Sequence, residues 1–252
     1  MKEFIKAYWN TLLFFAVVGL NGGYTVGLYQ LESFPEEIRQ EVYAQVLNDT
    51  LLGLVTAVQS AGYGLVLGAA GIWLGKKVGL WKDERRITKK PLLASIIVGV
   101  IGGLALILPD MLYFNHYSEA LAASYAAKPT ILFLLATVTY GAVIEEVMLR
   151  LFMMSLVAFV LHLLFERKRE TVSTAVLVAA NVVSALLFAA GHLPANDIMF
   201  GLTPMIVLRC MLLNGGFGLA FGWLYRKYGL RYAMIAHGGC HVVSKLIWIL
   251  FI

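Results

Sequence analysis

Long apolar runs alternate with short polar connectors along the whole chain. A transmembrane helix needs about 20 consecutive, mainly apolar residues, and most of these runs are long enough for one crossing. The pattern therefore predicts an all-α fold, a polytopic transmembrane bundle with about seven or eight membrane-spanning helices. The apolar runs cover approximately residues 8–29, 50–75, 92–109, 131–165, 175–192, 203–225 and 232–252.

The fourth run, residues 131–165, is too long for one ordinary span. It predicts either a long protruding helix or two elements broken near Arg150. The chain shows no internal repeat, no low-complexity linker and no composition shift that would mark a second domain. Residues 1–252 are therefore predicted to form a single integral membrane domain.

Composition supports the membrane assignment. The chain is 60% hydrophobic and only 14% charged, with a net charge of +5. Soluble domains carry closer to a quarter charged residues. The balance is thus typical of a multi-pass protein whose main surroundings are the lipid bilayer.

The basic residues gather in three short connectors, 75–90, 166–170 and 225–231, whereas residues 31–41 are acidic. Cytoplasmic connectors of membrane proteins carry such an excess of Lys and Arg. The positive charge therefore indicates orientation in a membrane, and we expect no binding to nucleic acid. A short chain without extra domains is typical of bacteria, so we expect a multi-pass protein of the bacterial cytoplasmic membrane.

Residues 144–150, "IEEVMLR", place charges inside the longest apolar run. Ionisable groups at bilayer depth cost several kcal/mol, are rare and are usually functional. On a helix Glu146 and Arg150 lie one turn apart and can form a structural ion pair. Glu145 is rotated about 100° away from that pair. Its charged form is disfavoured in an apolar wall, a property suited to a general base, so we favour a functional role for it.

The histidines within the apolar runs provide further candidates. Phe188 and His192 are four residues apart and share a helix face, and Asn181, about three turns earlier, lies on roughly the same face. His237 and His241 are also four residues apart. A histidine on an apolar helix can be either a satisfied core residue or a functional one, and this spacing alone does not decide between them.

Two imidazoles one helical turn apart can bind one metal ion, as in the HExxH helix of zinc proteases. Here Gly238 occupies the position of the glutamate of that motif. A second difficulty concerns depth in the membrane, because alternating spans place His192 near the outer end of its helix and His237 near the inner start of its own. If they share a site, one helix must be tilted, broken or re-entrant.

Taken in order along the chain, these residues resemble the three motifs of the CPBP family, the CAAX proteases and bacteriocin-processing enzymes that are also called the Abi family. Its motifs are EExxxR, FxxxH and a His followed four residues later by Asn or Asp. The third motif departs from this pattern, because His241 stands where the family has Asn or Asp. The resemblance covers about residues 131–245, which it predicts to be the catalytic core. The matching motifs are Glu145-Glu146-x-x-x-Arg150, Phe188-x-x-x-His192 and His237-x-x-x-His241.

This resemblance implies an intramembrane endopeptidase that hydrolyses a peptide bond in a membrane-associated peptide or protein, such as a prenylated CAAX tail or a leader peptide. Glu145, assisted by His192, would activate a water molecule. His237 and His241 would polarise the scissile carbonyl, directly or through a metal ion. Glu146, Arg150, Phe188 and Asn181 would support the site.

One carboxylate and three histidines can also form a zinc site with an open position, as in a metalloprotease. Its ligands would be drawn from Glu145, His192, His237 and His241. Both metal-dependent and glutamate-based mechanisms are proposed for the family, so one divalent ion remains an open alternative.

Two other functions stay open on the sequence. Intramembrane Glu, Arg and His also mark proton and ion pathways, although a transporter more often shows paired repeats. A non-catalytic immunity or scaffold protein could be built on the same fold.

Overall fold

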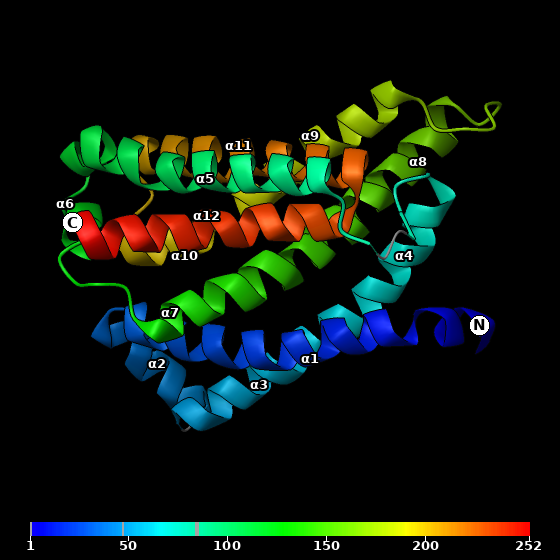
Figure 1. Ribbon diagram of the computed structural model, residues 1–252. Helices are drawn as coiled ribbons and strands as arrows, with labels where there is room; N and C mark the ends of the chain where they lie inside the picture. The colour runs from blue at the N-terminus through cyan, green and yellow to red at the C-terminus, as the bar shows by residue number, and fades with distance from the viewer. Residues whose placement is uncertain (1, 47, 84–85) are drawn as a thin grey trace.

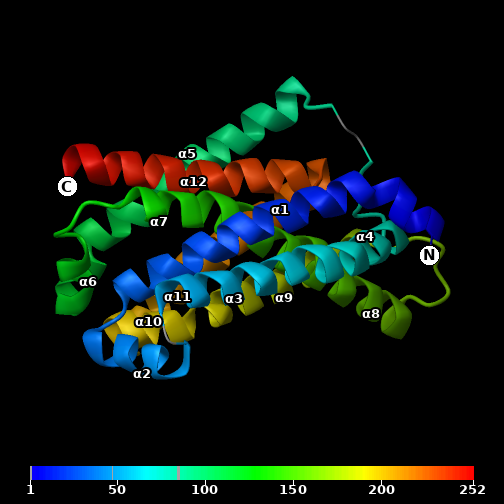
Figure 2. The same ribbon diagram turned by 90° about the horizontal axis from the view of Figure 1, so that it is seen from below.

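The computed structural model describes residues 2–46, 48–83 and 86–252, and these residues are helical with no strand (Figures 1 and 2). Seven of the described helical segments are long and apolar enough to cross a membrane. The all-α bundle predicted from hydropathy is therefore confirmed. The seven segments are Lys2–Ser33, Asp49–Lys77, Lys89–Leu112, Ile131–Phe165, Thr174–Phe200, Pro204–Tyr228 and Leu230–Phe251.

Several of these segments contain more than one helical element, and short helices connect others. The elements in chain order are α1 (Lys2–Ser33), α2 (Glu36–Val46), α3 (Asp49–Gly62), η1 (Tyr63–Leu67), α4 (Gly68–Lys77), α5 (Lys89–Leu112), η2 (Phe114–Tyr117), α6 (Glu119–Ser124), α7 (Ile131–Ala136), η3 (Thr137–Glu145), η4 (Val147–Met154), α8 (Ser155–Phe165), α9 (Thr174–Gly191), α10 (Leu193–Phe200), α11 (Pro204–Tyr228) and α12 (Leu230–Phe251).

Polar side chains at the starts of several helices explain where these begin. An N-cap side-chain oxygen accepts a hydrogen bond from a backbone N–H that has no partner within the helix. In this chain each such cap accepts from the N–H three residues later. The capping residues are Asn48 for α3, Thr130 for α7, Ser173 for α9 and Thr203 for α11.

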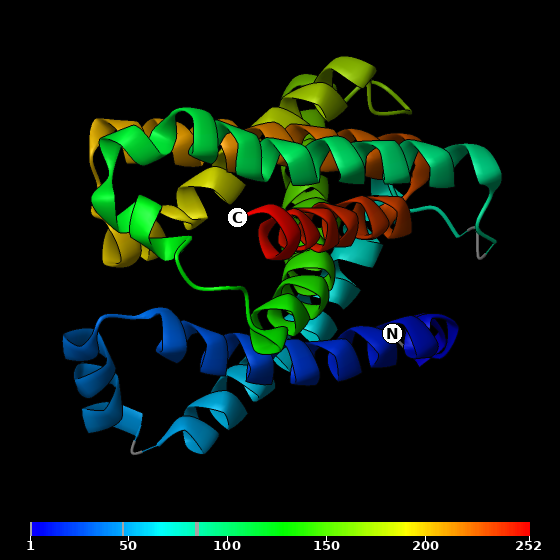
Figure 3. The same cartoon turned by 60° about the vertical axis from the view of Figure 1, so that its left-hand side comes forward.

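The long fourth span lies between two groups of helices. In Figure 3, α1 and α3 form one layer, α5, α11 and α12 form another, and the span from α7 to α8 crosses obliquely between them. The span is helical without interruption from Ile131 to Phe165, and its middle part, η3 and η4, is π-helical. The long-helix alternative is therefore confirmed, and no break occurs at Arg150. π-Helical turns inside α-helices frequently mark functional sites.

The two ends of the bundle differ in charge. Figure 1 shows the N-terminus, α4 and α8 at one end, and α2, α6 and the C-terminus at the other. The connectors 75–90, 166–170 and 225–231 all lie at the first end, which we call the basic end; Glu84 and Arg85 of the first connector lie outside the described residues. The acidic residues 31–41 lie at the opposite end, which we call the acidic end.

Small residues let the helices approach closely, as membrane helix packing requires. A Cβ added at Gly99 of α5 would lie 3.2 Å from the Cα of Gly239 in α12. At Gly218 of α11 an added Cβ would lie 2.8 Å from the Cα of Ala185 in α9. Larger side chains at these positions would force the helices apart.

The depth difficulty raised by His192 is resolved by where α9 ends. The Sγ of Cys210 donates to the carbonyl oxygen of Ala189 at 3.3 Å, so the last turn of α9 lies beside a point well inside α11. Cys210 is six residues after Pro204, a rise of about 9 Å along the helix. The α8–α9 hairpin protrudes at the basic end (Figure 1), and α10 completes the crossing. His192 therefore lies within the bundle.

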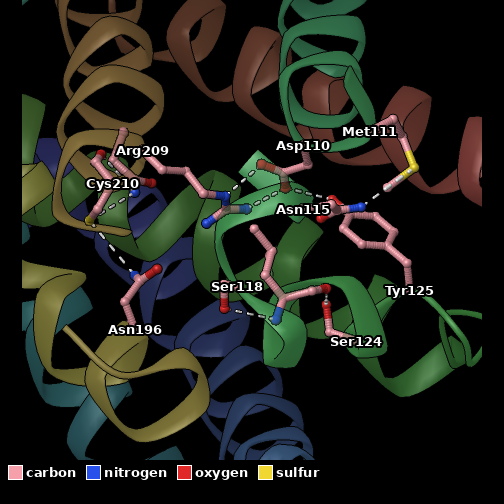
Figure 4. A network of polar contacts seen from close by, with 11 residues as sticks. Asp110, Met111, Asn115, Ser118, Ser124, Tyr125, Asn196, Arg209 and Cys210 are labelled. Carbon is pink, nitrogen blue, oxygen red and sulfur yellow. Dashed lines mark hydrogen bonds and ion pairs between the residues drawn. The ribbon is translucent and has the colours of Figure 1, made fainter. Parts of the chain in front are cut away.

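A buried ionic cluster joins three elements near the acidic end (Figure 4). Arg209 of α11 donates two hydrogen bonds of 2.6 Å to the carboxylate of Asp110 in α5. The hydroxyl of Tyr125, which follows α6, donates to the same carboxylate at 2.7 Å. Burial and the charge of Asp110 raise the pKa of Tyr125, so its hydroxyl stays protonated as a donor. Fork-like pairing of this kind is the strong form of an Arg–carboxylate contact.

Candidate active site

One cavity brings together the four residues that the sequence nominated as catalytic. It has a volume of about 240 Å³ and begins in the middle of the bundle. Glu145 reaches it from the end of η3, His192 from the end of α9, and His237 and His241 from α12. Four residues from three separate spans thus meet in one place, as three motifs of one site require.

Glu145 and Glu146 are adjacent in sequence but have different surroundings. Glu145 is partly exposed, lines the cavity and forms no ion pair with any of the described residues. Glu146 is completely buried. Its Oε1 lies 2.9 Å from Nδ1 of His237 and 3.2 Å from Nη1 of Arg150. The ion pair expected between Glu146 and Arg150 is therefore present, and Glu145 is the carboxylate left facing open space.

Aromatic rings hold the guanidinium of Arg150, which is 1% exposed. Its central carbon lies 4.3 Å from the ring centroid of Phe188 and 5.5 Å from that of Phe221. A guanidinium stacks well on aromatic faces because it is planar and weakly hydrated. The Phe221 ring also lies parallel to the His237 imidazole, with centroids 4.6 Å apart and planes 19° apart. The two phenylalanines thereby fix both partners of Glu146.

The contacts of His237 define a chain of hydrogen bonds. Nδ1 faces the carboxylate of Glu146, so we assign the proton to Nδ1, which leaves Nε2 as an acceptor. Nε2 of His241 lies 3.2 Å from Nε2 of His237 and is then the donor. His241, in the position where the family has Asn or Asp, therefore presents an N–H at the cavity.

His192 is held by its own helix. Its Nδ1 lies 2.8 Å from the carbonyl oxygen of Phe188, and this contact places the proton on Nδ1. Nε2 is then free to accept a proton or a hydrogen bond from the cavity. The Phe188 ring meets the imidazole edge-on, with centroids 4.7 Å apart. The FxxxH spacing thus places a supporting ring beside His192 and also beside Arg150.

Asn181 does not reach the cavity. Its amide donates to the carbonyl oxygen of Leu219 in α11 at 3.0 Å. A Cβ added at Gly222 would lie 1.8 Å from Oδ1 of Asn181, so the amide occupies the space that this glycine leaves. Asn181 therefore fastens α9 to α11, and it supports the site only through the position of α9.

Two lining residues were not nominated from the sequence. A Cβ added at Gly141 would lie 3.5 Å from Nε2 of His241 and 3.8 Å from Nε2 of His237, so the backbone of η3 passes directly beside both imidazoles. Phe221, which stacks on His237, is the second. A glycine one turn before Glu145 was the only available signal for Gly141. Phe221 had none, because its partner is distant in sequence.

The fit of a metal ion depends on how many ligands converge. The facing Nε2 atoms of His237 and His241 supply two nitrogen donors. In the described part of the chain, no three His, Cys, Asp or Glu side chains lie close enough together to hold one ion. A catalytic zinc site uses three protein ligands. The four-residue zinc set thus does not fit this arrangement, we derive no step through a metal, and metal dependence remains a prediction to be tested.

Comparison with known proteins identifies the segment that carries these motifs. Searches of curated proteins and of solved structures find no match to this chain. A family model described as type II CAAX prenyl endopeptidase Rce1-like matches residues 127–243. This range contains η3, η4, α9 and α12 up to the third motif, in agreement with the resemblance to the CPBP family. Residues 127–243 of this chain therefore belong to the Rce1-like family of type II CAAX prenyl endopeptidases.

Proposed function

We propose that this protein is a multi-pass intramembrane endopeptidase that hydrolyses a peptide bond in a membrane-associated peptide, with Glu145 as its general base. The family supports a CAAX-type intramembrane endopeptidase in general. The observation that carries the residue roles is the division between two neighbouring carboxylates. Glu146 is occupied by His237 and Arg150, whereas Glu145 faces the cavity shared with three histidines.

In this mechanism Glu145 takes a proton from a water molecule, and His192 holds the same water through its free Nε2. The water oxygen attacks the scissile carbonyl carbon, and the π electrons of the carbonyl move to its oxygen. Proton transfer by a well-placed side chain contributes about 10²–10⁴-fold to the rate. Glu145 then gives the proton to the departing nitrogen as the C–N bond breaks, which leaves a carboxylic acid and an amine.

The developing oxyanion needs a donor that is already in place. The N–H at Nε2 of His241 supplies it once the substrate carbonyl oxygen replaces Nε2 of His237 as its acceptor. A preorganised donor of this kind stabilises the transition state by about 3 kcal/mol. Glu146 acts indirectly, because it holds His237 in the tautomer and orientation that aligns His241.

Charge and cavity position support entry of the substrate from the acidic end. The basic end carries the Lys- and Arg-rich connectors and is therefore the cytoplasmic end by the positive-inside rule. The cavity is lined by the C-terminal part of α1, from Val26 to Phe34, and by the start of the fourth span, from Phe133 onward. Both lie toward the acidic end (Figure 1). We infer a substrate presented from the extracytoplasmic side.

The direct test is proteolysis in detergent or liposomes. Purified wild type, Glu145→Gln and the matched control Glu170→Gln, an exposed carboxylate at the basic end, are incubated with a library of membrane-associated peptides. Mass spectrometry identifies the products. Cleavage by wild type and Glu170→Gln but not by Glu145→Gln supports the proposal. Equal cleavage by all three would remove Glu145 as the base and return the cavity to a structural or transport role.

A further inference from the structure

A second cavity adjoins the candidate active site and extends to the acidic end. Its volume is about 440 Å³, and residues 127–130 of the loop before α7 form part of its lining. His241 and Phe133 line both cavities, so the second one begins where the catalytic groups end. The residues common to both linings are Tyr29, Ser33, Leu106, Phe133, Met199 and His241.

Lys245 lines this second cavity and is only 4% exposed. Its Nζ lies 3.9 Å from the centroid of the Phe133 ring. No carboxylate of the described residues forms an ion pair with it. A buried ammonium carries a desolvation penalty of several kcal/mol, and a cation–π contact returns about 2 kcal/mol at most sites of this kind. The charge is thus incompletely compensated.

The other charged groups that line this cavity have different positions or partners. Arg209 is paired with Asp110. Lys128 is directed to the carbonyl oxygens of Trp248 and Ile249, at 3.4 and 3.3 Å. Glu32 is exposed at the end of α1. Lys245 is therefore the buried cation that remains available to an anionic group inside the cavity.

We propose that Lys245 binds the C-terminal carboxylate of the peptide substrate, in a subsite next to the catalytic cavity. This assignment rests on the proposed endopeptidase function. An ammonium that donates to a carboxylate makes a charge-assisted hydrogen bond, the strong class, and the burial of Lys245 keeps competing water away. The Phe133 ring holds the ammonium in place when the subsite is empty.

Helix geometry sets how far the cleaved bond lies from that carboxylate. His237, His241 and Lys245 follow one another at four-residue intervals on α12. The rise from His241 to Lys245 is about 6 Å, and from His237 it is about 12 Å. An extended peptide spans about 3.3–3.6 Å per residue. The subsite therefore favours cleavage about two to four residues before a free C-terminus.

The kinetic test compares matched peptides that end in a free carboxylate or in an amide. Wild type, Lys245→Met and Lys245→Arg are assayed, with the exposed Lys168→Met as the charge-matched control. We expect Lys245→Met to raise KM for the acid peptide by about 10- to 100-fold, the value of one hydrogen bond to a charged group. KM for the amide should be the same in all variants, and Lys245→Arg should recover part of the loss. Equal acid-to-amide ratios in wild type and Lys245→Met would overturn the proposal.

A binding measurement keeps this test separate from catalysis. A short apolar tripeptide acid and its amide are added to Glu145→Gln and to Glu145→Gln/Lys245→Met in zwitterionic detergent, and thermal unfolding is followed. We expect the acid to raise the unfolding midpoint only where Lys245 is present, even if no cleavage is ever detected. Equal or absent protection would overturn the subsite. Lys245-dependent protection by phosphatidylglycerol but not by the tripeptide acid would assign the cation to a lipid headgroup instead.

Discussion

Glu146 and His237, which are 91 positions apart in the sequence, meet through a single contact of 2.9 Å between Oε1 and Nδ1. The same carboxylate oxygen faces the guanidinium of Arg150. One buried charge therefore joins the fourth span to α12 and orients the histidine whose other nitrogen faces His241. The stability of the bundle and the alignment of the candidate site depend on the same group.

Replacing Glu146 by Gln should destabilise the protein strongly. Arg150 would remain buried without its counter-ion, and removal of one partner from a buried pair costs about 3–5 kcal/mol. We expect a clear fall in the midpoint of thermal unfolding in detergent. The double variant Glu146→Gln/Arg150→Met should recover part of the loss, because it removes the unpaired charge. Additive effects of the two single substitutions would contradict a direct interaction.

Glu145→Gln should behave differently although it changes the neighbouring residue. We expect kcat to fall by about 10²–10⁴-fold, because the general base is lost. The unfolding free energy should change by no more than about 0.5 kcal/mol, because Glu145 is partly exposed and has no ion-pair partner among the described residues. Peptidase kinetics and thermal unfolding, measured on the same preparation, check both parts. A large loss of stability would show a structural role for this carboxylate.

Gly141→Ala tests whether the space beside the two imidazoles is used. The added methyl would be in ordinary van der Waals contact with Nε2 of His241, at 3.5 Å, so the fold should tolerate it. It would occupy room needed by the attacking water or the carbonyl oxygen, and we expect kcat/KM to fall at least about tenfold, a barrier change of about 1.4 kcal/mol. The matched control is Gly62→Ala, where an added Cβ meets no atom within 4 Å. Full activity of Gly141→Ala would place the reaction elsewhere.

Metal dependence can be measured directly on the purified protein. Because only two nitrogen donors converge, at His237 and His241, we expect activity to survive chelators and no stoichiometric zinc in elemental analysis. His241→Asn, which introduces a residue that the family has at this position, should retain activity because an amide can also donate to the oxyanion. Loss of activity on chelation, with recovery on addition of zinc, would restore the metalloprotease alternative.

The orientation of the bundle predicts which loops an impermeant thiol reagent reaches in intact cells. Both natural cysteines, Cys210 and Cys240, are buried and give a low background. Glu37→Cys in α2 should be labelled in intact cells, because it is exposed at the acidic end. Lys168→Cys at the basic end should be labelled only after lysis. The reverse pattern would place the cavity entrance on the cytoplasmic side.

The sequence by itself determined the spans, their order and the residues of the three motifs. Membrane helices satisfy all their backbone hydrogen bonds locally, so hydropathy and length alone identify them. Ion pairing between Glu146 and Arg150 was also accessible, because a helix brings residues four apart onto one face. The uninterrupted run from Ile131 to Phe165 agreed with one of the two alternatives that hydropathy allowed.

Only the tertiary structure decided which partners the polar groups choose. Asp110 and Arg209 are 99 positions apart, and neither the contact between them nor the stacking of Phe221 on His237 follows from any local spacing. The end of α9 in the middle of the bundle, which places His192 beside α12, depends on how α8 and α9 protrude. Lys245 continues the stripe begun by His237 and His241, but its lack of a described carboxylate partner is a property of the packed helices. A buried charge is defined by what surrounds it in space, and that information is carried by packing between distant segments.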